Sequence, residues 1–227
     1  MMNRLSLALL AALACSPCLA RDATLGRTTV KLTVPPGQCE LDRANAGDGR
    51  LLQAVDKAIG TNKLLAMHAD CKQHTDWRAG KRGLLEDFSQ YQVASQFIDA
   101  PPEPAPANAL KQLCAALRTE GERMMVGMAS DMKARVEEAI KNVQVNQSRF
   151  LGVMAEDPTA CYSAIVQRLK SETGKDVTIV GLFAAVYLKG KPVYYYLYSP
   201  YRSAQTATVL LAKHRQNVAT LLAANKQ

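Results

Sequence analysis

The stretch LLAMHADCKQHTDW, residues 64–77, concentrates the side chains that could do chemistry in this chain. His68 and His74 offer imidazole nitrogens, Asp70 a carboxylate and Cys71 a thiol, all of which are zinc ligands in proteins. The strongest zinc signatures use paired CxxC or HxxxH spacings, and this stretch has neither. We therefore predict a structural disulfide at Cys71. The alternative is a small metal-dependent hydrolase built around His68, Asp70 and His74.

Sequence motifs of catalysis are absent from the rest of the chain. It contains no GxSxG, HExxH or P-loop sequence, and no GxGxxG after a predicted strand. His214, the third histidine, is expected on the solvent-facing side of a helix. Adjacent acids such as Glu86 and Asp87 point apart on a strand or a helix. The sequence therefore favours a protein that is not an enzyme and that needs no cofactor or metal.

The first 20 residues have the pattern of a secretory signal peptide. An apolar run of ten residues, 5–14, follows a positive charge and precedes a small-residue cleavage site. The run is too short to span a bilayer, which takes about 20 apolar residues, and no later segment is longer. We expect cleavage before Arg21 and a single domain over residues 21–227. The alternative is a lipid anchor on Cys15, although lipoprotein signals usually carry Leu, Val or Ile where this chain has Ala12.

Four cysteines remain after the expected cleavage: Cys39, Cys71, Cys114 and Cys161. An even number in an oxidising compartment predicts disulfides, and four cysteines allow three pairings. Cys39 follows one predicted strand and Cys71 the next. Parallel neighbouring strands would bring both to the same end of the sheet, close enough to bond. We expect the pairs Cys39–Cys71 and, by elimination, Cys114–Cys161, the latter between two helices, in a periplasmic or secreted protein.

The net charge is basic but not concentrated. The chain has 28 Lys and Arg against 20 Asp and Glu, a formal charge of +8, which falls to +7 without the signal's one arginine. Lys and Arg never form a run of five or more, and no nucleic-acid-binding motif is present. We expect no nucleic-acid partner. A positive bias favours weak attraction to anionic envelope components.

A second conspicuous stretch is VYYYLYSPYR, residues 193–202. On a strand, Tyr194, Tyr196 and Tyr198 share one face, and Val193, Tyr195 and Leu197 share the other. Together with Tyr201 and Arg202, these tyrosines could form a contact surface, because tyrosine offers a large apolar area and a polar tip. The alternative is that they are ordinary strand residues that pack under the last helix.

Strand-like and helix-like patterns alternate around these residues. The helical pattern that starts at Asn108 would make a rod of about 50 Å, so a bend or break is expected near Gly121. The expected order is strand 28–34, helix 48–59, strand 64–69, an extended segment 83–98, helix 108–140, strand 148–157, helix 161–172, strands 177–188 and 193–201 joined by a turn at Gly190, and helix 203–226.

This order favours an α+β fold. The late hairpin needs antiparallel neighbours, so we predict a mixed, mainly antiparallel sheet packed between helices, with the hairpin followed by a C-terminal helix. The layout resembles the PsbP-like α-β-α sandwich of small lumenal and periplasmic proteins. The resemblance rests on KLTVPPG, GLFAAVYLKGKPVYYYLY and SAQTATVLLAKHRQNVATLL, and the long helix from Asn108 departs from it. It implies a layered fold and no particular function, because that fold hosts diverse roles.

Taken together, the sequence predicts an exported, non-catalytic protein of the cell envelope. It would act as a binding or accessory module toward a protein or another envelope component, with the tyrosine-rich hairpin at a sheet edge as its contact surface. A structural or inhibitory role toward another exported protein fits the same features. The hydrolase alternative differs in requiring that His68, Asp70 and His74 converge on one point.

Overall fold

The computed structural model describes residues 20–104, 108–139, 144–170 and 176–226, with side chains throughout except at 125–132. The helices are α1 Ala46–Ala58, α2 Cys71–Arg78, α3 Ala109–Ala139 and α4 Gln205–Ala224, and a 3-10 turn covers Ser95–Phe97. The strands are β1 Ala20–Leu25, β2 Thr28–Thr33, β3 Gln38–Glu40, β4 Asn62–Asp70, β5 Phe88–Ala94, β6 Gln144–Asp157, β7 Ala160–Lys170, β8 Asp176–Leu188 and β9 Lys191–Pro200.

Two expectations concern residues that the structure does not describe. The signal peptide over residues 1–20 and the alternative lipid anchor on Cys15 fall within residues 1–19, apart from Ala20. None of the described helices is long and apolar enough to cross a membrane.

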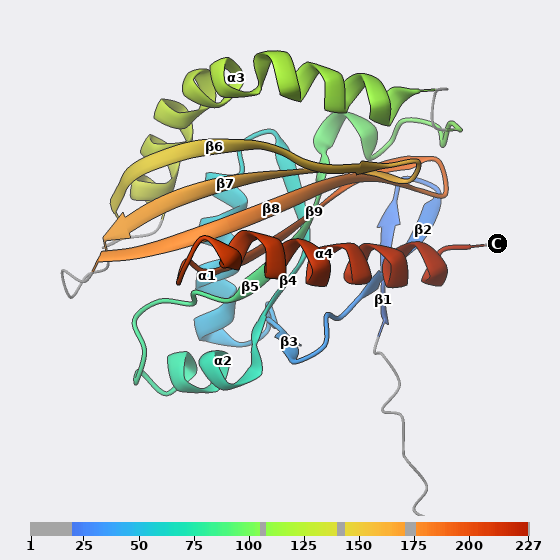
Figure 1. The fold of residues 1–227 in the computed structure, drawn as a ribbon. Helices are drawn as coiled ribbons and strands as arrows, with labels where there is room; N and C mark the ends of the chain where they lie inside the picture. Colours follow the sequence, from blue (N-terminus) through green and yellow to red (C-terminus); the bar gives the residue numbers. More distant parts are fainter. Residues whose placement is uncertain (1–19, 105–107, 140–143, 171–175, 227) are drawn as a thin grey trace, which may run out of the picture.

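The large sheet has seven strands in the order β3-β4-β5-β9-β8-β7-β6 (Figure 1). Every neighbouring pair in it is antiparallel. The α+β fold with a mainly antiparallel sheet and a late hairpin is therefore confirmed. The strand expected at 28–34 exists as β2, but it pairs only with β1, in a separate two-stranded sheet.

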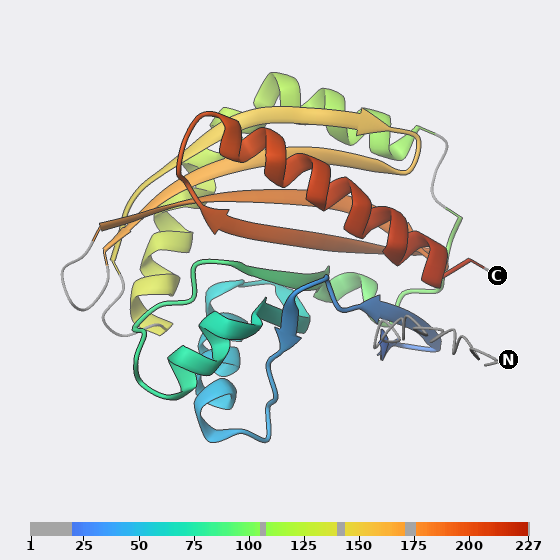
Figure 2. The same ribbon diagram turned by 60° about the horizontal axis from the view of Figure 1, so that its bottom comes forward.

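Helices cover both faces of the sheet, which makes a three-layered molecule (Figures 1 and 2). Helix α4 lies on one face, which we call the α4 face, and packs on β8, β9 and β2. Helix α3 lies on the opposite face, the α3 face, over β6 and β7, and α1 packs there on β4 and against α3. The alternation of β9 fits this layering, because Val193, Tyr195 and Leu197 are fully buried on the α4 face. Burying a large apolar side chain contributes roughly 1.5–3 kcal/mol.

One predicted element is wrong in type. Residues 161–172, expected as a helix, belong to strand β7, which pairs with β6 on one side and β8 on the other. Its residues 160–165 are all buried. A continuous apolar run cannot be assigned to a helix or a strand from its periodicity, and pairing with two long neighbours decides for a strand here.

The long helix α3 is continuous across Gly121, where a bend or break was expected. Figure 1 shows it curving around the sheet. Gly121 is buried, and a Cβ at this position would lie 2.3 Å from Cε1 of Phe150 on β6. The glycine therefore provides room for an aromatic ring between helix and sheet.

Both expected disulfides are present. The Cα atoms of Cys39 and Cys71 are 4.9 Å apart, and those of Cys114 and Cys161 are 5.6 Å apart. The expected geometry was wrong in each case. Cys39 lies on β3, which is antiparallel to β4, and Cys71 begins the helix that follows β4. Cys161 lies on β7, so the second bond ties α3 to the sheet and not to another helix.

Candidate functional site

The tyrosines of β9 lie at the centre of the sheet, not at its edge. Strand β9 is the fourth of seven and is flanked by β5 and β8, so the expected position at a sheet edge is wrong. Tyr194, Tyr196 and Tyr198 share the α3 face and are half-buried there. Tyr195 points to the α4 face and is fully buried. Tyr195 therefore packs under the last helix, as the alternative interpretation expected, and the contact surface formed by the other tyrosines stays a prediction.

Four rings form an aromatic row across the three central strands. Phe88 of β5 stacks on Tyr198 with centroids 4.4 Å apart and planes at 17°. Tyr198 and Tyr196 are nearly parallel at 6.4 Å, and Phe183 of β8 lies 6.0 Å from Tyr196. We call Phe88, Tyr198, Tyr196 and Phe183 the aromatic row. Offset stacking of this kind is favourable by about 0.5–1.5 kcal/mol per pair beyond the area that it buries.

A glycine on the neighbouring strand makes room for the row. Gly181 of β8 pairs with Tyr198, and a Cβ at Gly181 would lie 2.6 Å from Cε1 of that ring. The absent side chain lets the Tyr198 ring lie over β8, in line with the Tyr196 ring.

A row of amides runs beside the aromatic row. Asn62 Nδ2 donates to Gln92 Oε1 at 2.9 Å, and Gln92 Nε2 donates to Gln90 Oε1 at 2.8 Å. Gln90 is paired across the sheet with Tyr196, and Gln92 with Tyr194. The α3 face of β5 and β9 therefore places aromatic rings next to neutral amides, with no charged side chain among these residues. The side chains of Gln90 and Gln92 are buried there.

The hydroxyls of the row stay protonated at neutral pH. Burial raises the pKa of Tyr196 and of Tyr198 well above the usual value for tyrosine, and neighbouring tyrosines add to the shift at Tyr196. Neutral phenol groups can both donate and accept hydrogen bonds. Helix α3 packs on β6 and β7 and α1 on β4, so the two helices flank the central strands that carry the row.

Tyr201 and Arg202 lie beyond the end of β9, in the segment that leads to α4. Tyr201 is 44% exposed and its backbone N–H donates to Thr178 O at 2.7 Å. The Arg202 N–H donates to Thr206 Oγ1 at 3.0 Å. Of the five residues predicted as a contact surface, only Tyr196 and Tyr198 belong to the aromatic row, and Tyr194 continues their face.

His68, Asp70 and His74 do not assemble into one site. His68 is buried on the α4 face, with Nδ1 3.5 Å from Ser89 Oγ, and burial lowers its pKa to about 4. Asp70 caps α2 by accepting from the N–H of Gln73 at 2.9 Å. No group of three or more His, Cys, Asp or Glu side chains in the described residues is arranged to hold a metal. The geometry on which the hydrolase alternative depends is therefore absent.

His74 instead belongs to a buried cluster around Asp48. The His74 Nε2–H donates to Asp48 Oδ1 at 3.0 Å, and Arg78 donates to both carboxylate oxygens, with Nε at 3.0 Å. The N–H of Asp42 adds a bond of 2.8 Å. Burial alone would raise the pKa of Asp48, but the bonds from Arg78 and His74 outweigh it and lower the pKa to about 2. The cluster joins α1 to α2 and has a structural role.

His214 is fully buried, against the expectation of a solvent-facing side chain. Its ring stacks on Tyr195 with centroids 4.8 Å apart, and the Nε2–H donates to Tyr195 O at 3.2 Å. Burial lowers its pKa to about 3. The ring packs between α4 and the sheet.

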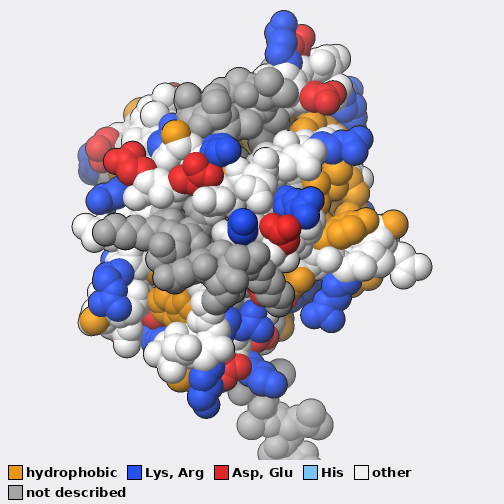
Figure 3. Space-filling model, turned by 90° about the vertical axis from the view of Figure 1, so that its left-hand side faces the viewer, with side chains coloured by type: hydrophobic (Ala, Val, Ile, Leu, Met, Phe, Trp, Pro, Cys, Tyr) orange, Lys and Arg blue, Asp and Glu red, His pale blue; other side chains and the backbone are white. Residues whose placement is uncertain are grey.

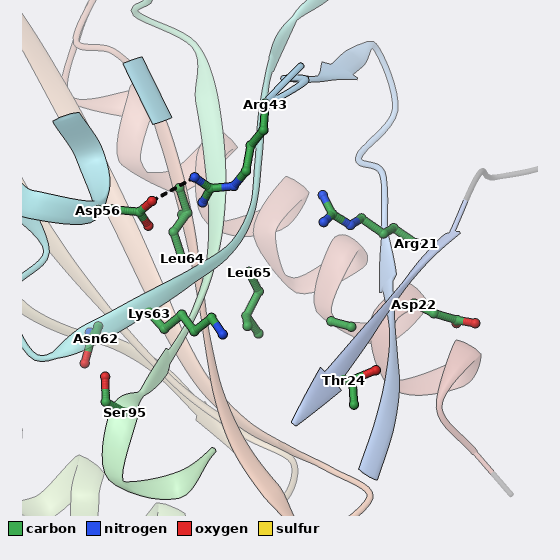
Figure 4. Close-up of a pocket in the computed structure, with 11 residues that line it drawn as sticks. Arg21, Asp22, Thr24, Arg43, Asp56, Asn62, Lys63, Leu64, Leu65 and Ser95 are labelled. Atoms are coloured by element: carbon green, nitrogen blue, oxygen red, sulfur yellow. Dashed lines mark hydrogen bonds and ion pairs between the residues drawn. The ribbon is translucent and has the colours of Figure 1, made fainter. Parts of the chain in front are cut away.

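A second surface, which the sequence did not indicate, is a cleft of about 590 Å³ between β1 and β4 (Figure 4). We call it the β1–β4 cleft. Its lining combines three cations, two acids and several small or apolar side chains: Arg21, Asp22, Ala23, Thr24, Arg43, Asp56, Asn62, Lys63, Leu64, Leu65 and Ser95. A sequence signal that could have pointed to it is the pair Gly26-Arg27 between two strand-like runs, which is typical of a hairpin turn.

Charge is scattered over the face in Figure 3, where Lys and Arg side chains lie among acidic and uncharged ones. Hydrophobic side chains are most numerous at the right of this view and also lie in smaller groups elsewhere on the face.

Comparison with protein-family models and with curated protein sequences gives no match. Among solved structures, the chain is similar to the Ran-binding protein Mog1p of Saccharomyces cerevisiae, with 13% identity and a TM-score of 0.31. The match covers 92% of this chain and 93% of that one. Similarity at this level assigns neither a family nor an activity to the chain.

Proposed function

We propose that this protein is an exported, non-catalytic binding module of the cell envelope, with the aromatic row as its contact surface. The observation that carries the proposal is the row itself: four aromatic rings, aligned across three central strands, with half-buried tyrosines among them. Ligand recognition uses a few polar groups on an apolar wall, and the phenol hydroxyls of Tyr196 and Tyr198 are such groups.

The two disulfides support the exported location, because disulfides persist in oxidising compartments. The periplasm, or secretion beyond it, is the compartment that we propose, together with removal of residues 1–20. The three layers, the hairpin of β8 and β9 and the closing helix α4 support the finer assignment to the PsbP-like sandwich, which we also propose.

The chemistry of the row favours an uncharged ligand. Flat rings offer stacking surfaces, and the phenol hydroxyls donate and accept hydrogen bonds. The amides of Gln90 and Gln92 are buried beside the row and bonded to each other, so they keep its surroundings neutral. None of the rings of the row and none of the amides beside it carries a charge that would recognise a phosphate or a carboxylate. A neutral oligosaccharide, with alternating apolar faces and hydroxyl groups, has the complementary chemistry.

The test is a titration of the purified mature protein with N-acetylglucosamine tetramer, followed by NMR and calorimetry. We expect the double variant Tyr196→Leu/Tyr198→Leu to weaken binding at least tenfold, because the loss of two stacking rings and two hydroxyls costs at least about 1.4 kcal/mol. The matched control is Tyr201→Leu, which removes an exposed tyrosine outside the row and should bind as the parent does.

Circular dichroism melting of each variant distinguishes lost contacts from lost structure. Equal affinity in the parent and the folded double variant would refute the aromatic row as the contact surface. So would the absence of any chemical-shift change on β5, β8 and β9 at millimolar sugar.

A further inference from the structure

The outer edge of β4 is free over much of its length. Strand β3 pairs only with residues 68–70 of β4, and the Leu41 N–H donates to Met67 O just beyond this pairing. No strand in the described residues pairs with Asn62–Ala66 on that edge. A free edge presents backbone N–H and C=O groups that can pair with another extended chain.

The hairpin opposite has one free edge and one blocked edge. Asn225, at the end of α4, blocks β2: its Oδ1 accepts from Lys31 N and its Nδ2 donates to Lys31 O, both at 2.8 Å. The side-chain amide thereby takes the place of a neighbouring strand. The outer edge of β1 has no such partner among the described residues and forms the wall of the β1–β4 cleft.

The lining shows that the cleft meets the edges of both strands. Four consecutive residues of β1, 21–24, line it, and so do four consecutive residues of β4, 62–65. Successive side chains of a strand point to opposite faces. On β1, four lining residues in a row therefore place the cleft along the strand's edge, where the backbone is reached from the side. On β4 a register shift between Leu64 and Ala66 interrupts the alternation, and the free edge there follows from the strand pairing. Its volume lies within the range of about 300–1,000 Å³ typical of ligand sites.

The side chains around the cleft favour an acidic occupant. Figure 4 shows the Arg21 guanidinium and the Lys63 ammonium directed into the cleft and the Asp22 carboxylate directed away from it. Arg21 is bonded to Glu40 at 2.5 Å and Arg43 to Asp56 at 2.8 Å. Exposed ion pairs of this kind contribute little and exchange partners readily. No ion pair joins Lys63 to an acidic side chain in the described residues.

From these observations we propose that the β1–β4 cleft binds an extended, acidic peptide segment of a partner protein, which adds to the free edge of β4 as a further strand. Backbone hydrogen bonds to residues 62–65 hold the peptide, and its carboxylates contact Lys63, Arg21 and Arg43. The same peptide faces β1 on its other side. This site is separate from the aromatic row and does not depend on the oligosaccharide proposal.

The experiment uses the mature protein and the peptide acetyl-(Glu-Val)3-amide. Its charge-reversed counterpart, (Lys-Val)3, tests the electrostatic contribution. A (Glu-Val)3 peptide that is N-methylated at alternate residues tests the backbone pairing, because it lacks the N–H groups of one edge. We expect the acidic peptide to bind in an NMR titration and to slow hydrogen exchange of those amides within residues 62–65 that point away from β5. The other two peptides should bind at least tenfold more weakly.

Charge-reversal variants complete the design. Lys63→Glu should weaken binding of the acidic peptide at least tenfold, and Lys72→Glu, an exposed lysine on α2, should leave it unchanged. No binding at millimolar peptide would overturn the proposal. Binding without protection of residues 62–65 would also overturn it, because the contact would then be electrostatic only. Protection of these amides in the peptide-free protein, by a second copy or another part of this chain, would show that the edge already has an occupant and would exclude the partner peptide.

Discussion

At the scale of single residues, two buried charged side chains are held in opposite ways. Asp48 is surrounded by donors from Arg78, His74 and the Asp42 backbone, which keep it ionised. Removing one partner of such a cluster leaves a buried group without its hydrogen bond, which is far costlier than the bond's net contribution. The charge therefore fixes the position of α2 against α1.

Lys191 is the second buried charge, 1% exposed at the turn between β8 and β9. Its Nζ donates to the carbonyl oxygens of Phe97 and Ile98, each at 3.0 Å, and to that of Ala100. A lysine carries three donors, and here all three are used. The side chain fastens the segment after β5 to the late hairpin.

Lys191→Met should lower the free energy of unfolding by about 2 kcal/mol, because the three carbonyl groups lose their donors while the apolar stem is kept. Urea unfolding followed by circular dichroism measures the change. Lys189→Met is the matched control in the same turn: its Nζ donates to Thr29 O at 3.0 Å, but the group is exposed. We expect a change within about 0.5 kcal/mol for the control. Equal losses in both variants would contradict the special role of Lys191.

At the scale of elements, α3 depends on a residue that ordinarily weakens helices. Glycine in a helix interior is less favourable than alanine by about 1 kcal/mol. A glycine fits at position 121 because the Phe150 ring occupies the space in which a Cβ would lie. The packing of α3 on β6 therefore outweighs the low helix propensity of glycine.

Gly121→Ala should therefore destabilise the protein by about 1–3 kcal/mol, the cost of overpacking, although the same change in an open helix would stabilise it. The double variant Gly121→Ala/Phe150→Leu should recover part of the loss, because the smaller side chain frees the space. Thermal and urea unfolding of the two variants measure both effects. A stabilising Gly121→Ala would show that helix and strand can move apart without cost.

At the scale of the whole molecule, the layer between α4 and the sheet holds two neutral histidines. Burial lowers the pKa of His68 to about 4 and that of His214 to about 3. In the unfolded chain both titrate near 6.5. The unfolded state therefore binds more protons than the folded state below pH 6.5, and stability falls as the pH falls from there.

We expect the free energy of unfolding to be nearly constant from pH 7 to 8 with respect to these groups. It should drop by roughly 3–4 kcal/mol between pH 7 and 5, from two groups at about 1.4 kcal/mol per pH unit. Urea unfolding at pH 5, 6 and 7 measures this slope. His214→Phe keeps the ring stacked on Tyr195 and should halve the slope. An unchanged slope in that variant would assign the acid sensitivity to other groups.

The fold class and much of the element order were predictable, because the relevant signals are local. Alternation along residues 193–198 assigned three tyrosines to one face and Tyr195 to the other, and helical spacing indicated α1, α3 and α4. The cysteine count and the expected compartment indicated two disulfides, and the expected pairs are present, although the strand geometry from which the first pair was inferred was wrong. The hydrophobic periodicity of a helix or a strand involves residues close together in the chain, so it can be read from the sequence alone.

The tertiary structure decided which strands are neighbours, and the site depends on that. Strand β9 is central because β5, about 100 residues earlier in the chain, pairs with it. Residues 160–170 form a strand because they pair with a long strand on each side, which outweighs their local preference for a helix. The aromatic row and the β1–β4 cleft each combine segments far apart in sequence. By itself, the sequence determined which side chains of a strand share a face and that the cysteines form disulfides. Pairing between distant segments, which no local pattern encodes, decided where the surfaces lie.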